Sequence, residues 1–211
     1  MDRALLDEQL AYYRARAPEY DQSIGTLEQL EPVKGALRAM GPFQQIVELA
    51  CGTGLWTSEL VAIGRTVTAI DASPEMIELN RRRVADPRVT YQRADLFGWE
   101  PAARYDFLFA AFWLSHVPPD ALDGFLGAVR MAVRHGGQIF IVDQCNDIAD
   151  DAQGEREGIC EQRRVADGRA FTIVKVYYHP LLLAEKLRAY GFEAAARREG
   201  ASFFSLIGRR R

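Results

Sequence analysis

A glycine turn near residue 50 follows a short apolar run and marks a possible ligand site. The run from Ile46 to Leu49 is typical of a buried parallel strand, and Gly52 and Gly54 come directly after it. Because glycine has no Cβ, such a turn can bend tightly and let a ligand approach the backbone. The dinucleotide pattern G-x-G-x-x-G would need a Gly or Ala where Thr57 stands. The turn therefore indicates a nucleotide-type ligand without the dinucleotide fingerprint.

An acidic residue ends the next predicted strand. The run 66–70 is again rich in apolar and β-branched residues, and Asp71 follows it directly. In open α/β sheets, ligands bind outside the carboxyl ends of the strands, and an acid about 20 residues beyond the glycine turn can accept hydrogen bonds from a ribose diol. Asp71 is therefore the predicted ribose contact.

The elements that would place these residues alternate along the chain. Strands are expected at 45–49, 66–70, 89–93, 105–110 and 138–143, the last after a turn at 135–137. Helices are expected at 56–63, 74–84 and 119–134, with Ser73 as N-cap of the second and Pro74 in its first turn. This alternation predicts an α/β fold with a doubly wound, mostly parallel sheet.

Further elements flank this core on both sides. Helices at 3–17 and 27–40 would form an N-terminal helical cap over residues 1–41. A β-prone run at 171–178, which could edge the sheet or cover the site, precedes a helix at 180–190 and a terminal hairpin of strands at 193–198 and 202–208. The polar stretch 146–168 is expected to be a solvated loop, an exposed helix or part of a lid over a substrate pocket.

Three motifs carry a resemblance to a known family. They are E-L-A-C-G-T-G at 48–54, I-D-A-S-P-E-M-I at 70–77 and R-A-D-L at 93–96. In this order they resemble the first three motifs of the class I S-adenosylmethionine-dependent methyltransferases, of the type that acts on small molecules. The resemblance implies a single Rossmann-like domain over 1–211, S-adenosyl-L-methionine as cofactor, and a seven-stranded sheet with N-terminal helices. In that sheet the last strand runs antiparallel between the fifth and the sixth.

The resemblance also implies which residues contact the methyl donor. Glu48 would reach the methionine amino group, Asp71 the ribose and Asp95 the adenine amine. Phe112 or Trp113 could lie near the sulfonium, or both could be core residues. Cys51 is not expected to be a nucleophile, because methyl transfer proceeds by direct attack on the methyl carbon. The implied cofactor contacts are Tyr12, Tyr20, Glu48, Ala50, Cys51, Gly52, Gly54, Trp56, Asp71, Ala72, Met76, Asp95, Leu96, Ala111 and Phe112.

His116 is the candidate catalytic residue. A histidine after the fourth strand faces the methyl acceptor in several small-molecule methyltransferases, and an imidazole can take a proton near neutral pH. In other members of the family the histidines of this segment are structural. The stretch 12–21 resembles a segment that closes over the cofactor, which makes Tyr13 and Arg16 candidate lid contacts. A phenol hydrogen-bonded to His116 would form a base dyad.

The composition narrows the class of protein further. A net charge of −3 argues against a large nucleic-acid surface. The cysteines Cys51, Cys145 and Cys160 form no C-x-x-C pair, so neither a metal site nor a disulfide framework is expected. The sequence has no long apolar run and no signal-peptide pattern at its start. We therefore expect a cytoplasmic protein without a membrane partner, either monomeric or homodimeric.

Three alternative functions remain open from the sequence. An NAD(P)-dependent oxidoreductase would share the strand, turn and acid, but the third small residue and a Tyr-x-x-x-Lys pair are missing. An RNA methyltransferase is disfavoured by F-A-A-F-W at 109–113, where N-P-P-Y or D-P-P-Y would favour it. A non-catalytic binding protein is the third alternative.

The methyl acceptor is expected to be a small molecule. Aromatic residues gather in the N-terminal cap, in 112–118 and in the insertion 146–178, which would lie near the substrate site. Such a lining favours a partly apolar metabolite. Its reacting atom could be O, N or S.

Overall fold

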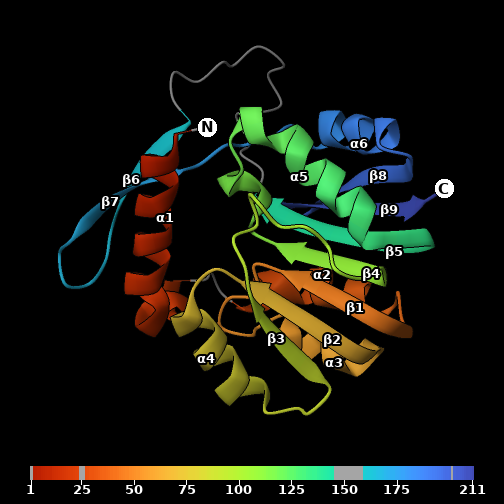
Figure 1. Cartoon of the computed structure of the whole chain (residues 1–211), viewed down its shortest axis with the longest axis horizontal. Helices are drawn as coiled ribbons and strands as arrows, with labels where there is room; N and C mark the ends of the chain where they lie inside the picture. Colours follow the sequence, from red (N-terminus) through yellow and green to blue (C-terminus); the bar gives the residue numbers. More distant parts are fainter. Residues whose placement is uncertain (1, 24–26, 145–158, 201) are drawn as a thin grey trace.

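A seven-stranded sheet forms the centre of the molecule (Figure 1). The computed structural model describes residues 2–23, 27–144, 159–200 and 202–211. The strand order is β3-β2-β1-β4-β5-β9-β8. The strands are β1 (Phe43–Leu49), β2 (Gly64–Asp71), β3 (Val89–Arg93), β4 (Tyr105–Ala111), β5 (Val133–Gln144), β8 (Phe192–Glu199) and β9 (Phe203–Arg210).

The topology confirms the predicted fold class. Strands β1 to β5 pair in parallel, whereas β9 lies antiparallel between β5 and β8. Helices α2 (Leu27–Arg38) and α3 (Thr57–Ile63) contribute to one buried core, and α5 (Pro119–Ala132) and α6 (Pro180–Ala189) contribute to the other. Because successive strand residues point to opposite faces, both sides of the sheet are covered.

The register of the parallel strands brings their carboxyl ends to one level. Leu49 at the end of β1 lies opposite Ile70 of β2 and Ala110 of β4. Helix α4 (Pro74–Val84) then starts beside this edge, where the Ser73 hydroxyl accepts the Met76 N–H at 3.2 Å as the predicted N-cap. The sequence motifs therefore converge at a single edge of the sheet.

Strand β5 differs from the prediction at its start. It begins at Val133 and so contains the residues 135–137 that were expected to form a turn before the strand. The pairing with β4 shifts register between Tyr105 and Phe107, and Gly136 has a φ of +75°. The glycines thus form an irregularity within the strand, because a bulge accommodates the extra residues without ending the pairing.

A small two-stranded hairpin stands apart from the main sheet. It consists of β6 (Cys160–Arg164) and β7 (Ala170–Val174), and β7 packs along α1 (Arg3–Arg16) (Figure 1). Side chains of α1 pair with the free edge of β7: Glu8 accepts the Thr172 N–H at 2.6 Å and Gln9 accepts the Val174 N–H at 2.9 Å. The helix thereby satisfies backbone groups that an edge strand would expose.

The hairpin corrects two expectations about the insertion. The β-prone run does not edge the main sheet, and it ends at Val174 instead of 178. Strand β6 was not predicted, because its side chains are mostly exposed and leave no apolar alternation in the sequence. Residues 145–158, including Cys145 and the start of the predicted insertion, lie outside the described residues. No helix in the described ranges is long and apolar enough to cross a membrane.

Candidate functional site

The turn after β1 has a backbone conformation that requires its glycines. Gly52 and Gly54 have φ values of +51° and +92°, and Ala50 has a φ of +52° although it carries a Cβ. Phe112, at the matching end of β4, has a φ of +57°. Non-glycine residues rarely adopt this region, and where they do the strain often accompanies a binding site.

Asp71 ties two of the loops together. One carboxylate oxygen accepts the Gly52 N–H at 2.9 Å and the other accepts the Ser73 N–H at 2.9 Å. Burial raises the pKa of this carboxyl, while the backbone donors oppose that shift. Because each oxygen has a further lone pair, Asp71 can still accept from a ligand hydroxyl.

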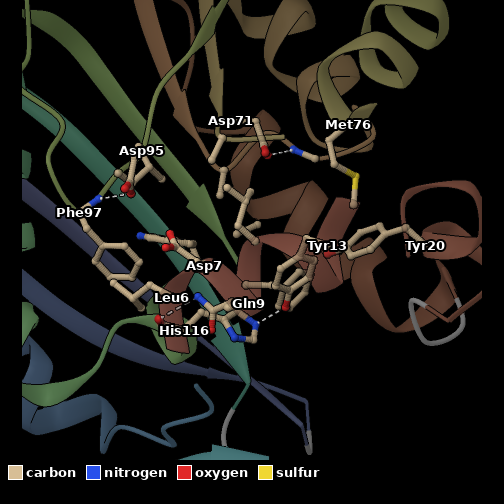
Figure 2. Close-up of a pocket in the computed structure, with 18 of the residues that line it drawn as sticks. Leu6, Asp7, Gln9, Tyr13, Tyr20, Asp71, Met76, Asp95, Phe97 and His116 are labelled. Carbon is tan, nitrogen blue, oxygen red and sulfur yellow. Dashed lines mark hydrogen bonds between the residues drawn. The ribbon is translucent and has the colours of Figure 1, made fainter. Parts of the chain in front are cut away.

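A cleft of about 800 Å³ opens over this edge of the sheet (Figure 2). Apolar side chains and the strand ends form its floor. Ten of the implied cofactor contacts line it, together with the candidate base His116: Tyr20, Ala50, Gly52, Asp71, Ala72, Met76, Asp95, Leu96, Ala111 and Phe112.

Helix α1 forms the opposite wall of the cleft. Leu6, Gln9 and Tyr13 line it together with other residues of the helix (Figure 2). Of these, only Tyr13 was a sequence candidate. The helical spacing of the apolar residues predicted an amphipathic helix, but nothing in a single sequence says which neighbour its apolar face meets.

Five predicted cofactor contacts do not line the cleft. Cys51, Gly54 and Trp56 lie in or beside the turn but behind its surface. Tyr12 instead packs in a small core with Val165 and Ile173. Glu48 is the fifth.

Glu48 is buried behind the turn. Its side chain accepts a hydrogen bond from the Thr57 hydroxyl at 2.6 Å. Burial raises the pKa of Glu48 to about 8, which Thr57 only partly counters. The carboxyl is therefore mostly protonated at neutral pH in this structure.

Cys51 shows the same effect of burial. The thiol lies buried, and desolvation raises its pKa well above the usual value. A thiol in that state is a poor nucleophile, in keeping with the expectation that Cys51 plays no covalent role.

Asp95 forms local contacts at the rim of the cleft. It accepts the Phe97 N–H at 3.0 Å within its own turn (Figure 2). It also pairs with Arg3 of α1 at 3.0 Å. Its predicted contact with adenine stays a prediction.

His116 and Tyr13 form a hydrogen-bonded pair between η2 (Leu114–His116) and α1. The Tyr13 hydroxyl lies 2.7 Å from Nε2 of His116 (Figure 2). The other ring nitrogen, Nδ1, lies 2.7 Å from the Val174 carbonyl. Since a carbonyl can only accept, Nδ1 carries the proton and Nε2 accepts the phenol O–H. The hydrogen bond between a phenol and His116 that the sequence predicted is present. It leaves Nε2 without a free lone pair, because Nε2 already accepts from Tyr13.

Burial sets the charge state of this pair. It lowers the pKa of His116 to about 3, and the nearby Lys175 lowers it further in the same direction. Burial also raises the pKa of Tyr13 well above its usual value. Both groups are therefore neutral at physiological pH.

A second pocket of about 710 Å³ adjoins the cleft and shares Tyr13, Tyr20, Phe112 and His116 with it. Three cationic side chains line the pocket: Arg16 from the end of α1, Arg163 from β6, and Lys175 after β7. Among the residues that the structure describes, no carboxylate lines it.

Each of these cations is held in place by a neighbour. Lys175 donates to the Ser115 hydroxyl at 2.9 Å, Arg163 pairs with Glu161, and Arg16 donates to Tyr12 at 2.6 Å. Sequence reasoning named Arg16 but missed Arg163 and Lys175. Their convergence depends on the hairpin, which the sequence pattern does not predict.

Comparisons with known proteins decide the family. A family model described as a methyltransferase domain matches residues 46–137. The solved complex of DhpI with SAM and HEP aligns with a TM-score of 0.91 and 35% identity, over 99% of this chain and 99% of that chain. The protein belongs to the class I S-adenosylmethionine-dependent methyltransferases.

Two curated relatives of this methyltransferase match more locally. The uncharacterised methyltransferase sll0829 of Synechocystis sp. is 31% identical over 109 residues, which are 50% of this chain and 49% of that protein. The trans-aconitate 2-methyltransferase of Azoarcus sp. (strain BH72) is 36% identical over 98 residues, which are 46% of this chain and 37% of that protein. The aligned regions thus span half or less of both relatives.

The comparisons confirm S-adenosylmethionine as the cofactor of the methyltransferase. DhpI holds SAM in one structure and SAH in another, which aligns with a TM-score of 0.86 and 35% identity. The oxidoreductase alternative is thereby set aside. In the described residues, no group of three or more His, Cys, Asp or Glu is placed to hold a metal ion.

Proposed function

We propose that this methyltransferase transfers the methyl group of S-adenosylmethionine to an oxygen atom of a small anionic acceptor, a carboxylate or a phosphate-type group. The observation that carries the proposal is the cationic pocket beside the cofactor cleft. Arg16, Arg163 and Lys175 line it, and no described carboxylate does. The cofactor cleft and the second pocket share Tyr13, Tyr20, Phe112 and His116. An anion in the second pocket would therefore lie next to the methyl donor.

The residues of the first cleft suit the parts of S-adenosylmethionine. Asp71 keeps lone pairs for the ribose diol, and Met76 and Leu96 offer an apolar surface for adenine. Phe112 lies where the two pockets meet, and an aromatic face there would attract the sulfonium cation. When bound, the cofactor supplies the electrophilic methyl carbon.

Electrostatics favours an anion in the second pocket. Lys175 is buried, and desolvation lowers the pKa of its ammonium, so a negative ligand would compensate for lost hydration. Arginine matches the two oxygens of a carboxylate or phosphate with its planar donors. Asp143 is buried near Lys175 and partly offsets its charge, but Asp143 does not line the pocket.

An ionised oxygen also fits the chemistry that the site allows. The oxygen would attack the methyl carbon as the carbon–sulfur bond breaks, which leaves S-adenosylhomocysteine and an ester that carries one negative charge fewer than the acceptor. No proton has to be removed from such an acceptor. The unprotonated nitrogen of His116 already accepts from Tyr13, so His116 offers no free nitrogen that could act as a base in this structure.

One relative supports the same class of acceptor, whereas several others are ubiquinone biosynthesis O-methyltransferases. The Azoarcus relative is a trans-aconitate 2-methyltransferase, and trans-aconitate is a polycarboxylate. One domain over residues 1–211 is part of the proposal, because the second pocket takes residues from α1 and from Phe203 of β9. The cytoplasmic location and the monomeric or homodimeric state stay predictions.

Paired acceptors test the proposal. Small carboxylic and phosphonic acids are compared with their amides and methyl esters of similar size, and the release of S-adenosylhomocysteine is measured. We expect turnover with some of the acids and none with the matched neutral compounds. Preferential methylation of an amine, a thiol or a neutral hydroxyl would refute the anionic acceptor.

Replacing His116 with glutamine tests the role of the imidazole. Because the pKa of His116 lies at about 3, it is neutral above about pH 5, and kcat should show no inflection near 6.5. We expect kcat to fall by less than about tenfold, the scale of one hydrogen bond. A general base would instead lose about 10²- to 10⁴-fold.

Tyr13→Phe is the matched variant for the same pair. If His116 acts by orienting the phenol, the double variant should lose no more activity than either single variant. A wild-type rate that falls as pH drops through 6.5, together with additive losses, would restore His116 as the base.

A further inference from the structure

Asn80 of α4 lies directly beneath the glycine turn. Its side chain is fully buried, with 0% exposure. The amide nitrogen donates to the Thr57 hydroxyl at 2.7 Å and to the Cys51 carbonyl at 3.3 Å. One side chain therefore connects the middle of the turn with the start of α3.

The turn also rests on Asn80 by close packing. A Cβ added to Gly54 would lie 2.7 Å from Oδ1 of Asn80 and 3.1 Å from its Cα. Gly52, by contrast, has nothing within 4 Å of an added Cβ on its side. Gly54 thus approaches α4 at a distance that only glycine permits.

Asn80 is the centre of a directional hydrogen-bond chain. The Tyr91 hydroxyl donates to Oδ1 of Asn80 at 2.9 Å, the Asn80 amide donates to Thr57, and Thr57 donates to Glu48. The partners fix which end of the amide is nitrogen, since Cys51 offers a carbonyl. Both N–H groups of the Asn80 amide donate in this network, and its oxygen accepts one hydrogen bond.

We propose that Asn80 is a positioning residue for the methyl donor. It holds the Cys51 carbonyl and the backbone at Gly54, and so keeps the turn in the positive-φ conformation that opens the cleft to the cofactor. The inference concerns the donor cleft and does not depend on the identity of the acceptor. Asn80 touches the turn from behind and does not line the cleft.

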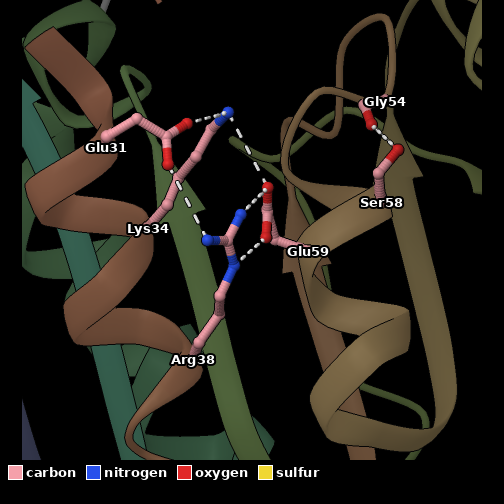
Figure 3. A network of polar contacts seen from close by, with 6 residues as sticks. All are labelled: Glu31, Lys34, Arg38, Gly54, Ser58 and Glu59. Atoms are coloured by element: carbon pink, nitrogen blue, oxygen red, sulfur yellow. Dashed lines mark hydrogen bonds and ion pairs between the residues drawn. The ribbon is translucent and has the colours of Figure 1, made fainter. Parts of the chain in front are cut away.

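The far end of the turn is anchored independently of Asn80. The Ser58 hydroxyl donates to the Gly54 carbonyl at 3.0 Å, and Glu59 pairs with Arg38 at 2.6 Å and Lys34 at 3.7 Å (Figure 3). The ion pairs of Glu59 join α3 to α2. A change at Asn80 should therefore act on the turn without releasing the helix.

Asn80→Asp is the sharpest test, because it keeps the shape and replaces the donor with an oxygen that faces the Cys51 carbonyl. We expect S-adenosylhomocysteine to bind at least tenfold more weakly by calorimetry, and KM for S-adenosylmethionine to rise in proportion. At saturating donor, kcat and the acceptor KM should stay within about twofold. That split distinguishes a positioning role from a general loss of structure.

Ser205→Ala is the matched control. Ser205 is equally buried, at 0% exposure, and donates to Glu199 at 2.7 Å within the β8 and β9 pair. Its loss should lower the melting temperature without weakening donor binding. If Asn80→Asp lowers the melting temperature as much as Ser205→Ala and binds the donor normally, the proposal is wrong.

Tyr91→Phe covers the case in which Asn80→Asp does not fold. It removes only the hydroxyl that fixes Oδ1 of Asn80. We expect about threefold weaker donor binding with an unchanged acceptor KM. Unchanged donor binding in this variant would contradict the proposed role.

Discussion

Replacing Asp71 with alanine is expected to weaken the binding of S-adenosylhomocysteine by a hundredfold or more. The change removes the predicted ribose contact, and it also leaves the Gly52 and Ser73 N–H groups without their acceptors. A backbone N–H group left without its acceptor costs about 1–3 kcal/mol. If the two loops lose their order and must regain it when the ligand binds, that cost lowers the affinity by roughly ten- to hundredfold. Isothermal titration calorimetry measures the effect directly.

Asp106→Ala provides a matched control for Asp71. Asp106 lies near the opposite end of β4 and likewise accepts two backbone N–H groups, from Gln44 and Gln45, both at 2.7 Å. Its loss should lower stability but leave the affinity for S-adenosylhomocysteine unchanged. If Asp71→Ala binds within about threefold of the wild type, Asp71 does not hold the ribose.

Replacing Arg163 with glutamine is expected to lower kcat/KM for the acceptor by about tenfold. A hydrogen bond to a charged group contributes about 1.5–3 kcal/mol, and the 43% exposed side chain of Arg163 should lie at the lower end of that range because solvent screens its charge. Arg163 also still interacts with Glu161 in the free protein. Steady-state kinetics with an acid acceptor measures kcat/KM, and the affinity for S-adenosylhomocysteine should stay unchanged.

The neighbouring Arg164 is the control for this prediction. It is exposed, does not line the second pocket, and donates to the Gly168 carbonyl at the end of the hairpin. Arg164→Gln should leave kcat/KM within about twofold. Equal effects of the two substitutions would remove Arg163 from the acceptor site and undermine the anionic acceptor.

The arrangement of the glycine turn and Asp71 at one edge of the sheet was largely predictable from the sequence. The turn and Asp71 lie on consecutive strand ends, and the parallel register brings such ends together whatever the remaining chain does. Glu48 shows where this reasoning stops. Its place near a strand end was correct, but the side chain points behind the turn, and a motif does not define that direction.

The acceptor side could not be predicted in the same way. Arg163 belongs to a hairpin with few buried residues, and Lys175 directly follows it, so hydrophobic alternation did not reveal the hairpin. Their proximity to Arg16 depends on how that hairpin packs against α1, which is a contact between distant parts of the chain. Sequence periodicity describes each element separately and contains no information about such a contact.

The packing of α1 on β7 has a consequence for the engineering of acceptor preference. Glu8 and Gln9 supply the acceptors that the backbone of β7 would otherwise find in another strand. Grafted alone, the hairpin would expose an unprotected edge, and the helix alone would carry polar side chains without partners. A chimera between relatives should therefore exchange residues 2–23 and 159–179 as one unit, even though they lie far apart in the sequence.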